Sequence, residues 1–331
     1  MGAGRNVYAG SDGGGDTGSA RAAPDAAAAA RAERAAPGDD DVRSGVRPVD
    51  RMCALYAVVS GAALVFPHRP AGWPWIALAH AVAVALLLRL GLAGPLLARI
   101  GRRAPRLTGF LHDAYPLLLV PALYGELAAL NVAVHDGRYF DEWIIGWEAL
   151  LFGGQPSRDL AGALPVPLLS EVLHGAYLSY YLIIYAPPLA LYLAARREAF
   201  REVVFALMLT FFVHYLFFIY FPVQGPRYLF EPPVVEEAAG PLYGLAHAVL
   251  ETGSSRGAAF PSSHVGIAAA QTLLVARFLP LWLPVVALLS VGLAAGAVYG
   301  GFHYATDALA GLALGLPLAA LAPAVRHRLD R

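Results

Sequence analysis

The stretch REVVFALMLTFFVHYLFFIYFP, residues 201–222, decides the fold. After the two charged residues at its start, it contains no Asp, Glu, Lys or Arg. An α-helix needs about 20 such residues to cross the hydrocarbon core of a bilayer, so the stretch predicts a transmembrane helix. Of the 331 residues, 58% are hydrophobic and 15% are charged, and the mean hydropathy is +0.55. This composition is typical of a membrane protein rather than of a soluble domain.

Other apolar blocks of similar length lie on both sides of this stretch. They predict an all-α fold, a polytopic integral membrane helical bundle of about eight transmembrane helices. The expected spans are near 52–67, 73–97, 113–134, 167–194, 201–222, 259–279, 281–299 and 303–323. Between the third and fourth spans, the sequence YFDEWIIGWEALLFGG (139–154) has two Trp and three acidic residues. We expect this segment to lie along the membrane interface.

The rest of the composition narrows the class of function. Residues 1–46 are rich in Ala, Gly, Asp and Arg and have almost no large apolar side chains, which predicts a disordered tail. The tail does not have the pattern of a signal peptide. The formal net charge is zero and provides no field that would attract nucleic acid. With one cysteine, Cys53, the chain has no intrachain disulfide and no thiolate metal cluster.

Clusters of arginine predict the orientation in the membrane. They are Arg43 with Arg47 and Arg51, RIGRRAPR (99–106), ARREAFR (195–201) and VRHRLDR (325–331). With eight spans, all of these clusters fall on one side, which the positive-inside rule assigns to the cytoplasm. We therefore expect a multi-pass protein of the plasma (inner) membrane with both termini in the cytoplasm. The loop 223–258 and the starts of the sixth and eighth spans then lie on the extracytoplasmic side.

The first polar motif is RGAAFPSSHVGIA, residues 256–268. Pro261 suits the first turn of a helix, so we expect Ser262, Ser263 and His264 in the N-terminal turn of the sixth span. The free N–H groups and the positive end of a helix dipole favour an anion there. His264 adds a proton that can be exchanged near neutral pH.

Two further motifs fall on the same side of the predicted bundle. In YGGFHYATDALAG (299–311), His303 and Asp307 are four residues apart, so on a helix they would share one face. A carboxylate there can hold one ring nitrogen and leave the other as a nucleophile or base. In FPVQGPRYLF (221–230), Arg227 offers a planar guanidinium group that suits phosphate oxygens.

Together these residues predict a phosphate-handling site that uses neither a metal nor another cofactor. His303 would attack phosphorus and form a phosphohistidine, with Asp307 orienting its ring. His264 would protonate the leaving oxygen and then activate an alcohol or water acceptor. The expected phosphate-binding residues are Arg227, Ser262, Ser263 and Arg256. The substrate would be a membrane lipid phosphate.

The motifs resemble those of the type 2 phosphatidic acid phosphatase superfamily. PSSHV (261–265) is similar to the second motif of that family, usually Pro-Ser-Gly-His. GFHYATDALAG (301–311) is similar to the third, His-x-x-x-Asp with a following Ala-Gly. The resemblance implies a six-helix core that holds the active site. In this chain the core would be residues 111–325, with residues 47–110 as two additional N-terminal transmembrane helices.

Departures from the family pattern indicate one branch of it. Where the first motif begins with Lys and ends with Arg-Pro, this chain has only GPRY with Arg227. Phosphatase members carry an Arg six residues before the third-motif His, and here that residue is Ala297; Ser263 replaces the usual Gly. The smaller set of arginines beside His264, His303 and Asp307, together with HDAYPLLL (112–119), is more similar to the pattern of the inositol-phosphorylceramide and sphingomyelin synthase branch. The resemblance implies transfer of a phosphoryl-headgroup from one lipid to another alcohol.

Two alternatives remain beside this transferase. A lipid phosphate or polyprenyl diphosphate phosphatase would use the same residues with water as the acceptor. A lipid binder or transporter without catalysis would be expected to lack one of the two His or the Asp, and all three are present. Glu171 and His174 share a helical face and, with Tyr304, are expected to line the acceptor pocket. Glu171 and His174 could form half of a metal site, but the sequence has no second pair of this kind, so no metal is expected.

Overall fold

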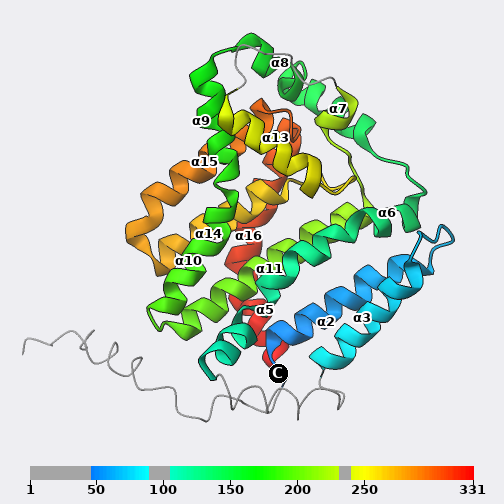
Figure 1. Cartoon of the computed structure of the whole chain (residues 1–331), viewed down its shortest axis with the longest axis vertical. Helices are drawn as coiled ribbons and strands as arrows, with labels where there is room; N and C mark the ends of the chain where they lie inside the picture. Colours follow the sequence, from blue (N-terminus) through cyan, green and yellow to red (C-terminus); the bar gives the residue numbers. More distant parts are fainter. Residues whose placement is uncertain (1–45, 89–104, 231–239) are drawn as a thin grey trace, which may run out of the picture. The chain divides into compact units, whose positions relative to one another are not determined.

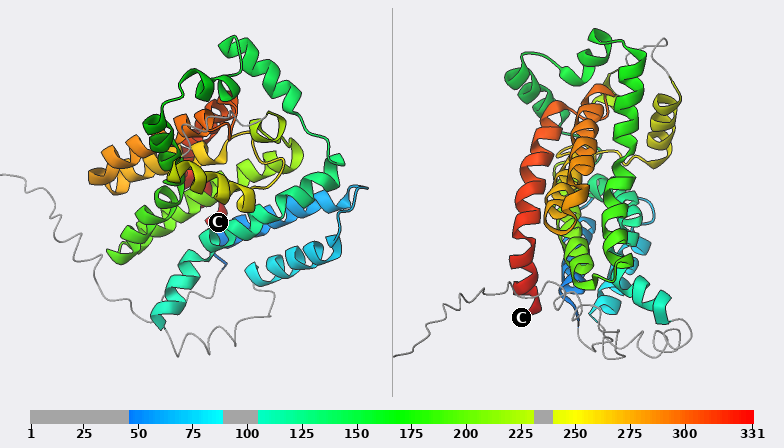
Figure 2. Two further views of the ribbon diagram at one scale, coloured as in Figure 1. Left: turned by 45° about the horizontal axis from the view of Figure 1, so that its top comes forward. Right: turned by 90° about the vertical axis from the view of Figure 1, so that its left-hand side faces the viewer.

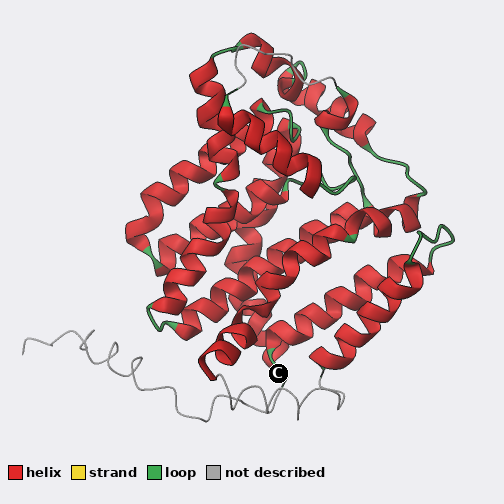
Figure 3. Cartoon of the chain, in the orientation of Figure 1, coloured by secondary structure: helices red, strands yellow, loops and turns green. Residues whose placement is uncertain are grey.

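The computed structural model of the chain describes residues 46–88, 105–230 and 240–331. All described residues belong to one compact unit, residues 44–331. Within these ranges the structure is helical, and its one extended pairing is an isolated bridge between Val223 and Ala258 (Figures 1 and 3). The tail predicted for residues 1–46 lies outside the described residues except for Val46. Most of RIGRRAPR (99–106) also lies outside them.

The α-helices of the described ranges follow one another with short connections (Figure 1). They are α2 (Pro48–Gly61), α3 (Trp73–Leu87), α5 (Pro105–Gly125), α6 (Leu127–His135), α7 (Asp141–Phe152), α8 (Pro156–Ala163), α9 (Pro167–Leu178), α10 (Tyr180–Leu193), α11 (Arg197–Tyr220), α12 (Pro226–Leu229), α13 (Pro241–Gly253), α14 (Ser263–Phe278), α15 (Leu283–Tyr299) and α16 (Ala305–Asp330). Short 3-10 turns, Ala62–Val65 and Pro280–Trp282, extend α2 and precede α15.

The all-α membrane fold is confirmed, but the expected eight spans are not reached. In the described ranges, the helices long and apolar enough to cross a membrane are Pro48–Val65, Arg197–Tyr220, Pro280–Tyr299 and Ala305–Asp330. Two bent pairs raise the number from four to six if each pair is one span: α5 with α6, bent by 47°, and α9 with α10, bent by 42°. Helices α7 and α8 are not among the candidate spans.

The remaining two expected spans are too short. In the described residues α3 has 15 residues and α14 has 16. At 1.5 Å per residue both are shorter than about 25 Å, below the ~30 Å of a hydrocarbon core. The end of the span expected at 73–97 lies outside the described residues.

Helix α11 lies at the centre of the described bundle. It packs against α5, α6, α10, α14 and α16. Most of its apolar side chains are buried, including Phe205, Leu207 and Phe218, as expected for a helix surrounded by others. The outer helices α15 and α16 instead expose apolar side chains such as Leu288 and Leu312, which suits contact with lipid.

Helices α14 and α16 approach each other so closely that only glycine fits at their contact (Figure 2). A Cβ atom on Gly311 would overlap the carbonyl oxygen of Ser262, and one on Gly315 would overlap that of Gly266. On the other side, a Cβ on Gly266 would meet the ring of His214. Small residues allow such close helix contacts in membranes. The contact places the N-terminal ends of the two motif-bearing helices side by side.

The N-terminal helices α2 and α3 pack on each other, and α2 also packs on α11 and α16. Inside this region, Nε2 of His80 lies 3.0 Å from Oε2 of Glu126, the residue at the break between α5 and α6. Nδ1 of His80 lies 2.9 Å from the carbonyl oxygen of Ala57. The pair gives a buried acid the partner that it needs in an apolar region.

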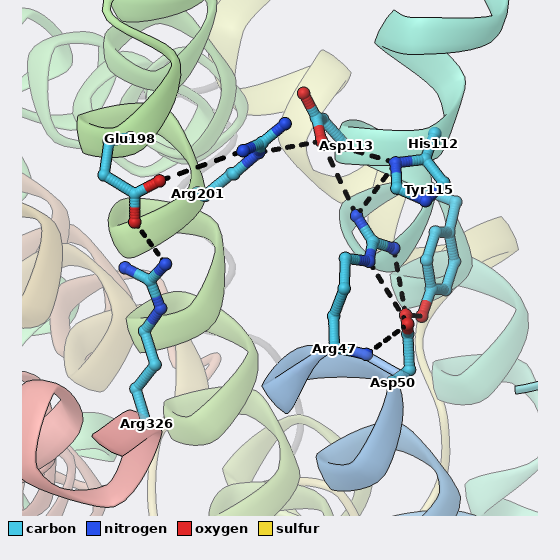
Figure 4. Close-up of polar contacts among 8 residues, drawn as sticks. All are labelled: Arg47, Asp50, His112, Asp113, Tyr115, Glu198, Arg201 and Arg326. Carbon is cyan, nitrogen blue, oxygen red and sulfur yellow. Dashed lines mark hydrogen bonds and ion pairs between the residues drawn. The ribbon is translucent and has the colours of Figure 1, made fainter. Parts of the chain in front are cut away.

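Arginines from three of the predicted clusters meet at one end of the bundle (Figure 4). Asp113 on α5 lies 3.0 Å from Nε of Arg201 on α11 and 3.5 Å from Nη1 of Arg47 at the start of α2. Glu198 lies between Arg201 and Arg326 of α16 and pairs with both. This placement agrees with the prediction that these clusters share one side of the membrane.

The polar motifs lie at the other ends of the same helices. Helix α16 has 26 residues. Its length of about 39 Å, at 1.5 Å per residue, separates its first turn, near His303, from Arg326. Helix α11 likewise begins beside Arg201 and ends just before the loop that carries Arg227. The bundle therefore has an arginine-rich end and a motif end.

Candidate active site

Two loops are joined where they enter the motif end. Val223 in the first loop pairs with residues 257–259 in the second. The Val223 N–H donates to the Gly257 carbonyl oxygen, and the Ala259 N–H donates to the Val223 carbonyl oxygen. The join places GPRY beside the approach to α14. Helix α14 starts at Ser263, and Ser262 is its N-cap, whose hydroxyl accepts a hydrogen bond from the Val265 N–H at 3.4 Å.

The two motif histidines face each other. Nε2 of His303 lies 3.3 Å from Nδ1 of His264. Nδ1 of His303 lies 3.1 Å from the carbonyl oxygen of Ala259 and 3.5 Å from Oδ2 of Asp307. Both of these oxygens accept hydrogen bonds, so the geometry assigns the ring proton to Nδ1. The lone pair of Nε2 is then directed toward His264.

Asp307 contacts His303 in a different way from the one expected. The expected helix 303–323 begins at Ala305, so His303 precedes it and the two residues are not one turn apart on a helix. Asp307 instead lies in the first turn, where Oδ2 accepts a hydrogen bond from the Tyr304 N–H at 2.9 Å. The side chain is fully buried, and the Asp307 carbonyl oxygen accepts from the Ser262 N–H at 2.9 Å. Capping of α16 thus holds the carboxylate against His303.

Aromatic rings enclose His264. The ring centroid of Tyr180 lies 4.2 Å from that of His264, and the centroid of Tyr177 lies 5.1 Å away. The Tyr177 hydroxyl lies 3.4 Å from Nε2 of His264. His303 is only 3% exposed. The histidine pair therefore lies in a largely apolar environment, with His303 buried and His264 partly exposed, in which electrostatic interactions are stronger than in water.

The two predicted phosphate-binding arginines lie around one tyrosine ring. The guanidinium group of Arg227 lies 5.2 Å from the Tyr228 ring centroid, and that of Arg256 lies 5.1 Å from the same centroid. Nη1 of Arg227 donates to the hydroxyl of Ser254 at 3.3 Å. Arg227 is half-buried, whereas Arg256 is exposed.

The two serines are buried beside the histidines. The hydroxyl of Ser262 is used as the N-cap of α14, and Ser263 is 3% exposed in the first helical residue. Pro261 was expected in the first turn of this helix and instead precedes the N-cap. The reason is that Ser262 is a strong capping residue, which starts the helix one residue after itself.

Ala297, at the position where phosphatase members carry an arginine, is completely buried. It packs in an apolar cluster with Tyr177, Ala246 and Phe302. Its carbonyl oxygen accepts hydrogen bonds from the N–H groups of Phe302 and His303, both at 3.0 Å. The position therefore shapes the turn that carries His303, and a guanidinium group has no space there.

The residues expected to line the acceptor pocket have other contacts. Glu171 caps α13: its carboxylate accepts hydrogen bonds from the N–H groups of Leu242 and Tyr243, both at 2.9 Å. Both Glu171 oxygens are therefore used at a helix N-terminus, and the expected place of Glu171 in an acceptor pocket stays a prediction. Nδ1 of buried His174 lies 2.7 Å from the Ser170 carbonyl oxygen. Within the described ranges no group of His, Cys, Asp or Glu is arranged to hold a metal ion.

Tyr304 is fully buried, and its hydroxyl points to an acid that the motifs did not reveal. The hydroxyl donates to Oδ1 of Asp141 at 3.2 Å. A second acid of α7, Glu148, is fully buried and accepts a hydrogen bond from the Ala305 N–H at 2.6 Å. Burial raises the pKa of Glu148 to about 7, although the Ala305 N–H lowers it. The sign in the sequence is their spacing of seven residues in a mostly apolar segment that contains one further acid, Glu142.

The described fold and site define a class: an all-helical, multi-pass membrane protein with two facing histidines between two helix N-termini. A family model of the PAP2 superfamily matches residues 142–321, more than half of the chain. The chain belongs to the PAP2 superfamily. Its members are phosphatases and phosphotransferases, so the protein is a lipid-phosphate enzyme of that general type. Comparison with curated proteins and with solved structures gave no match.

Proposed function

We propose that the protein transfers a phosphoryl-headgroup from a membrane lipid to an alcohol through a phosphohistidine at His303. The observation that carries the proposal is the placement of His303 between acceptors on one side and His264 on the other. Fixing the proton on Nδ1 leaves Nε2 free as the nucleophile. The second histidine is within reach of any group bound at that nitrogen.

The reaction has two balanced steps. In the first, Nε2 of His303 attacks phosphorus, the bond from phosphorus to the leaving oxygen breaks, and His264 supplies the proton that this oxygen takes up. In the second, His264 removes a proton from the acceptor hydroxyl, whose oxygen attacks phosphorus and breaks the nitrogen–phosphorus bond. Asp307 balances the positive charge on the His303 ring during both steps.

Charge on the phosphoryl oxygens would be stabilised by groups that surround the histidine pair. Arg227 supplies a guanidinium group, and the N-terminal turn of α14, which is capped by Ser262, supplies the N–H group and hydroxyl of Ser263 and a positive dipole. Arg256 is more exposed and would contact the headgroup at the rim of the site. These roles are part of the proposal.

Two observations favour an alcohol over water as the acceptor. His303 is almost fully buried, which limits the access of water to the intermediate. In addition, Ala297 replaces an arginine that the resemblance associates with phosphatases, as in the inositol-phosphorylceramide synthase branch. We therefore favour a transferase of that type, and a lipid phosphate or polyprenyl diphosphate phosphatase is the alternative outcome of the test.

The test is a paired assay on purified protein, with the wild type beside His303→Ala. Labelled phospholipids and polyprenyl phosphates are offered with and without inositol or ceramide, and both free phosphate and new phosphorylated lipid are measured. New phosphorylated lipid that is lost in the variant supports the transferase. Release of free phosphate that does not depend on added alcohol would favour the phosphatase over the transferase. Unchanged activity in His303→Ala would reject the mechanism.

We also propose that the site faces away from the cytoplasm in the plasma (inner) membrane. The arginine-rich end, at Arg47, Arg201 and Arg326, would then be cytoplasmic according to the positive-inside rule. The lipid substrate would enter the motif end from the outer leaflet.

A further inference from the structure

Helix α7 has two faces of opposite character. Trp143, Trp147 and Leu150 are exposed on one face, at 61%, 39% and 83%. The opposite face carries Asp141 and Glu148, both buried. Seven residues correspond to about two helical turns, so both acids point the same way. A buried carboxylate is costly unless hydrogen bonds compensate it, and the partners of these two acids indicate what they do.

Asp141 binds three donors from two segments of the site. Oδ2 accepts from the Gln224 N–H at 3.0 Å, and Oδ1 accepts from the Gly225 N–H at 2.9 Å and from the Tyr304 hydroxyl at 3.2 Å. Gln224 and Gly225 lead directly into α12, which carries Arg227. One carboxylate thus connects the arginine loop to the residue that follows His303.

Glu148 binds the start of the helix that carries Asp307. Oε1 accepts from the N–H of Ala305, the first residue of α16, at 2.6 Å. Oε2 lies 3.3 Å from the hydroxyl of Ser157 on α8, which is the donor. The bond occupies an N–H that no carbonyl within α16 can reach, and a carboxylate is favoured at a helix N-terminus.

We propose that Asp141 and Glu148 are positioning residues that hold the Arg227 loop and the His303 turn in register for catalysis. Neither acid contacts the histidine pair, so each acts through backbone and hydroxyl groups that it holds. The inference rests on the proposed function, because register matters only if the arginine and the histidine act on the same phosphoryl group. A displacement of about 1 Å in such a site can reduce the rate by about 100-fold.

The two acids should differ in their response to an isosteric amide. In Glu148→Gln the amide oxygen can accept from the Ala305 N–H, while its NH2 group donates to the Ser157 hydroxyl, which can also accept. In Asp141→Asn each side-chain oxygen position faces a backbone N–H, that of Gln224 or that of Gly225, so in either orientation the new NH2 group faces a group that can only donate. If only the size of the side chain mattered, Glu148→Gln and Asp141→Asn would both keep the activity of the wild type.

The experiment compares Glu148→Ala, Glu148→Gln, Asp141→Ala and Asp141→Asn in lipid nanodiscs. Turnover of a labelled phospholipid and of a labelled polyprenyl phosphate, each offered with inositol or ceramide, gives kcat and KM, and hydrogen exchange is followed in peptides that cover residues 221–230 and 300–310. Glu142→Gln is the matched control, because Glu142 is an exposed acid of the same helix.

We expect kcat to fall about 10- to 100-fold in Glu148→Ala and in both Asp141 variants, with KM changed much less. Exchange should rise near Ala305 in Glu148→Ala and near Gly225 in Asp141→Ala. Glu148→Gln and Glu142→Gln should remain close to the wild type. Unchanged exchange, an unchanged kcat, or an Asp141→Asn variant as active as Glu148→Gln would overturn the inference. If the wild type turns over neither lipid, the proposed function fails, and exchange alone decides whether α7 holds the two segments.

Discussion

At the scale of single residues, each ring nitrogen of His303 has its own environment. Nδ1 lies next to the Ala259 carbonyl oxygen and Asp307, and Nε2 lies next to His264. The two nitrogens can therefore have different roles without any rearrangement of the ring. Glu148 does not contact the histidines but binds the N–H of Ala305, two residues after His303, and is itself fully buried.

Glu148 should make the stability of the protein depend on pH. Burial, together with a smaller effect of the nearby Asp307 charge, raises the pKa of Glu148 to about 7. The folded state then keeps a proton that the unfolded state loses at a lower pH, so this contribution to stability falls as pH rises toward 7 and levels off above it. Thermal unfolding is measured from pH 5 to pH 8. The melting temperature of Glu148→Gln should rise relative to that of the wild type as pH increases. Parallel curves for the two proteins would contradict this prediction.

The motif residues could be predicted from the sequence, whereas the α7 acids could not. His264, His303 and Asp307 stand in short patterns whose residue types are required by the chemistry. Asp141, Glu148 and Glu171 bind mainly backbone N–H groups, and every residue except proline supplies such a group. The sequence therefore does not indicate which residues these acids bind, and the contacts are known only from the structure.

At the scale of elements, the close contact of α14 with α16 brings the two motifs together. Gly266, Gly311 and Gly315 allow carbonyl groups of one helix to touch the Cα atoms of the other. Periodic hydrophobicity predicted the helices themselves. It could not predict the bends at Glu126 and Ser179 or the start of α16 after His303, because these depend on capping and on contacts with other segments.

Adding one methyl group at this contact should separate the histidines. Gly311→Ala would press on the Ser262 carbonyl oxygen, next to the residues that hold His264. Overpacking of this kind costs about 1–3 kcal/mol, and we expect a lower melting temperature together with a loss of most activity. Gly109→Ala is the control, since Gly109 is exposed in α5 with open space at its Cβ position. Equal activity and stability in the two variants would show that the close contact is unimportant.

At the scale of the whole described bundle, the helices connect an arginine-rich end with a motif end. Arg47, Arg201 and Arg326 come from distant parts of the sequence and meet around Asp113 and Glu198 (Figure 4). Within the described ranges, four helices qualify as spans, or six if each bent pair is one span. Apolar composition alone does not reveal that α14 has 16 residues or that bends follow α5 and α9.

Cysteine labelling in intact cells tests the proposed orientation. The native Cys53 is buried, so the unmodified protein should give little background with a membrane-impermeant maleimide. We expect Glu142→Cys, on the exposed face of α7, to react from outside. Arg328→Cys, exposed near the end of α16, should react only after the cells are opened. The reverse pattern would place the active site in the cytoplasm.

The most direct test of the central claim is to identify the residue that becomes phosphorylated. Purified protein would be mixed with a ³²P-labelled lipid phosphate, quenched under alkaline conditions that preserve phosphohistidine, and digested for mass spectrometry. The account predicts label on the peptide that contains His303, and no label in His303→Ala. Label on another residue, or turnover without any labelled histidine, would contradict it.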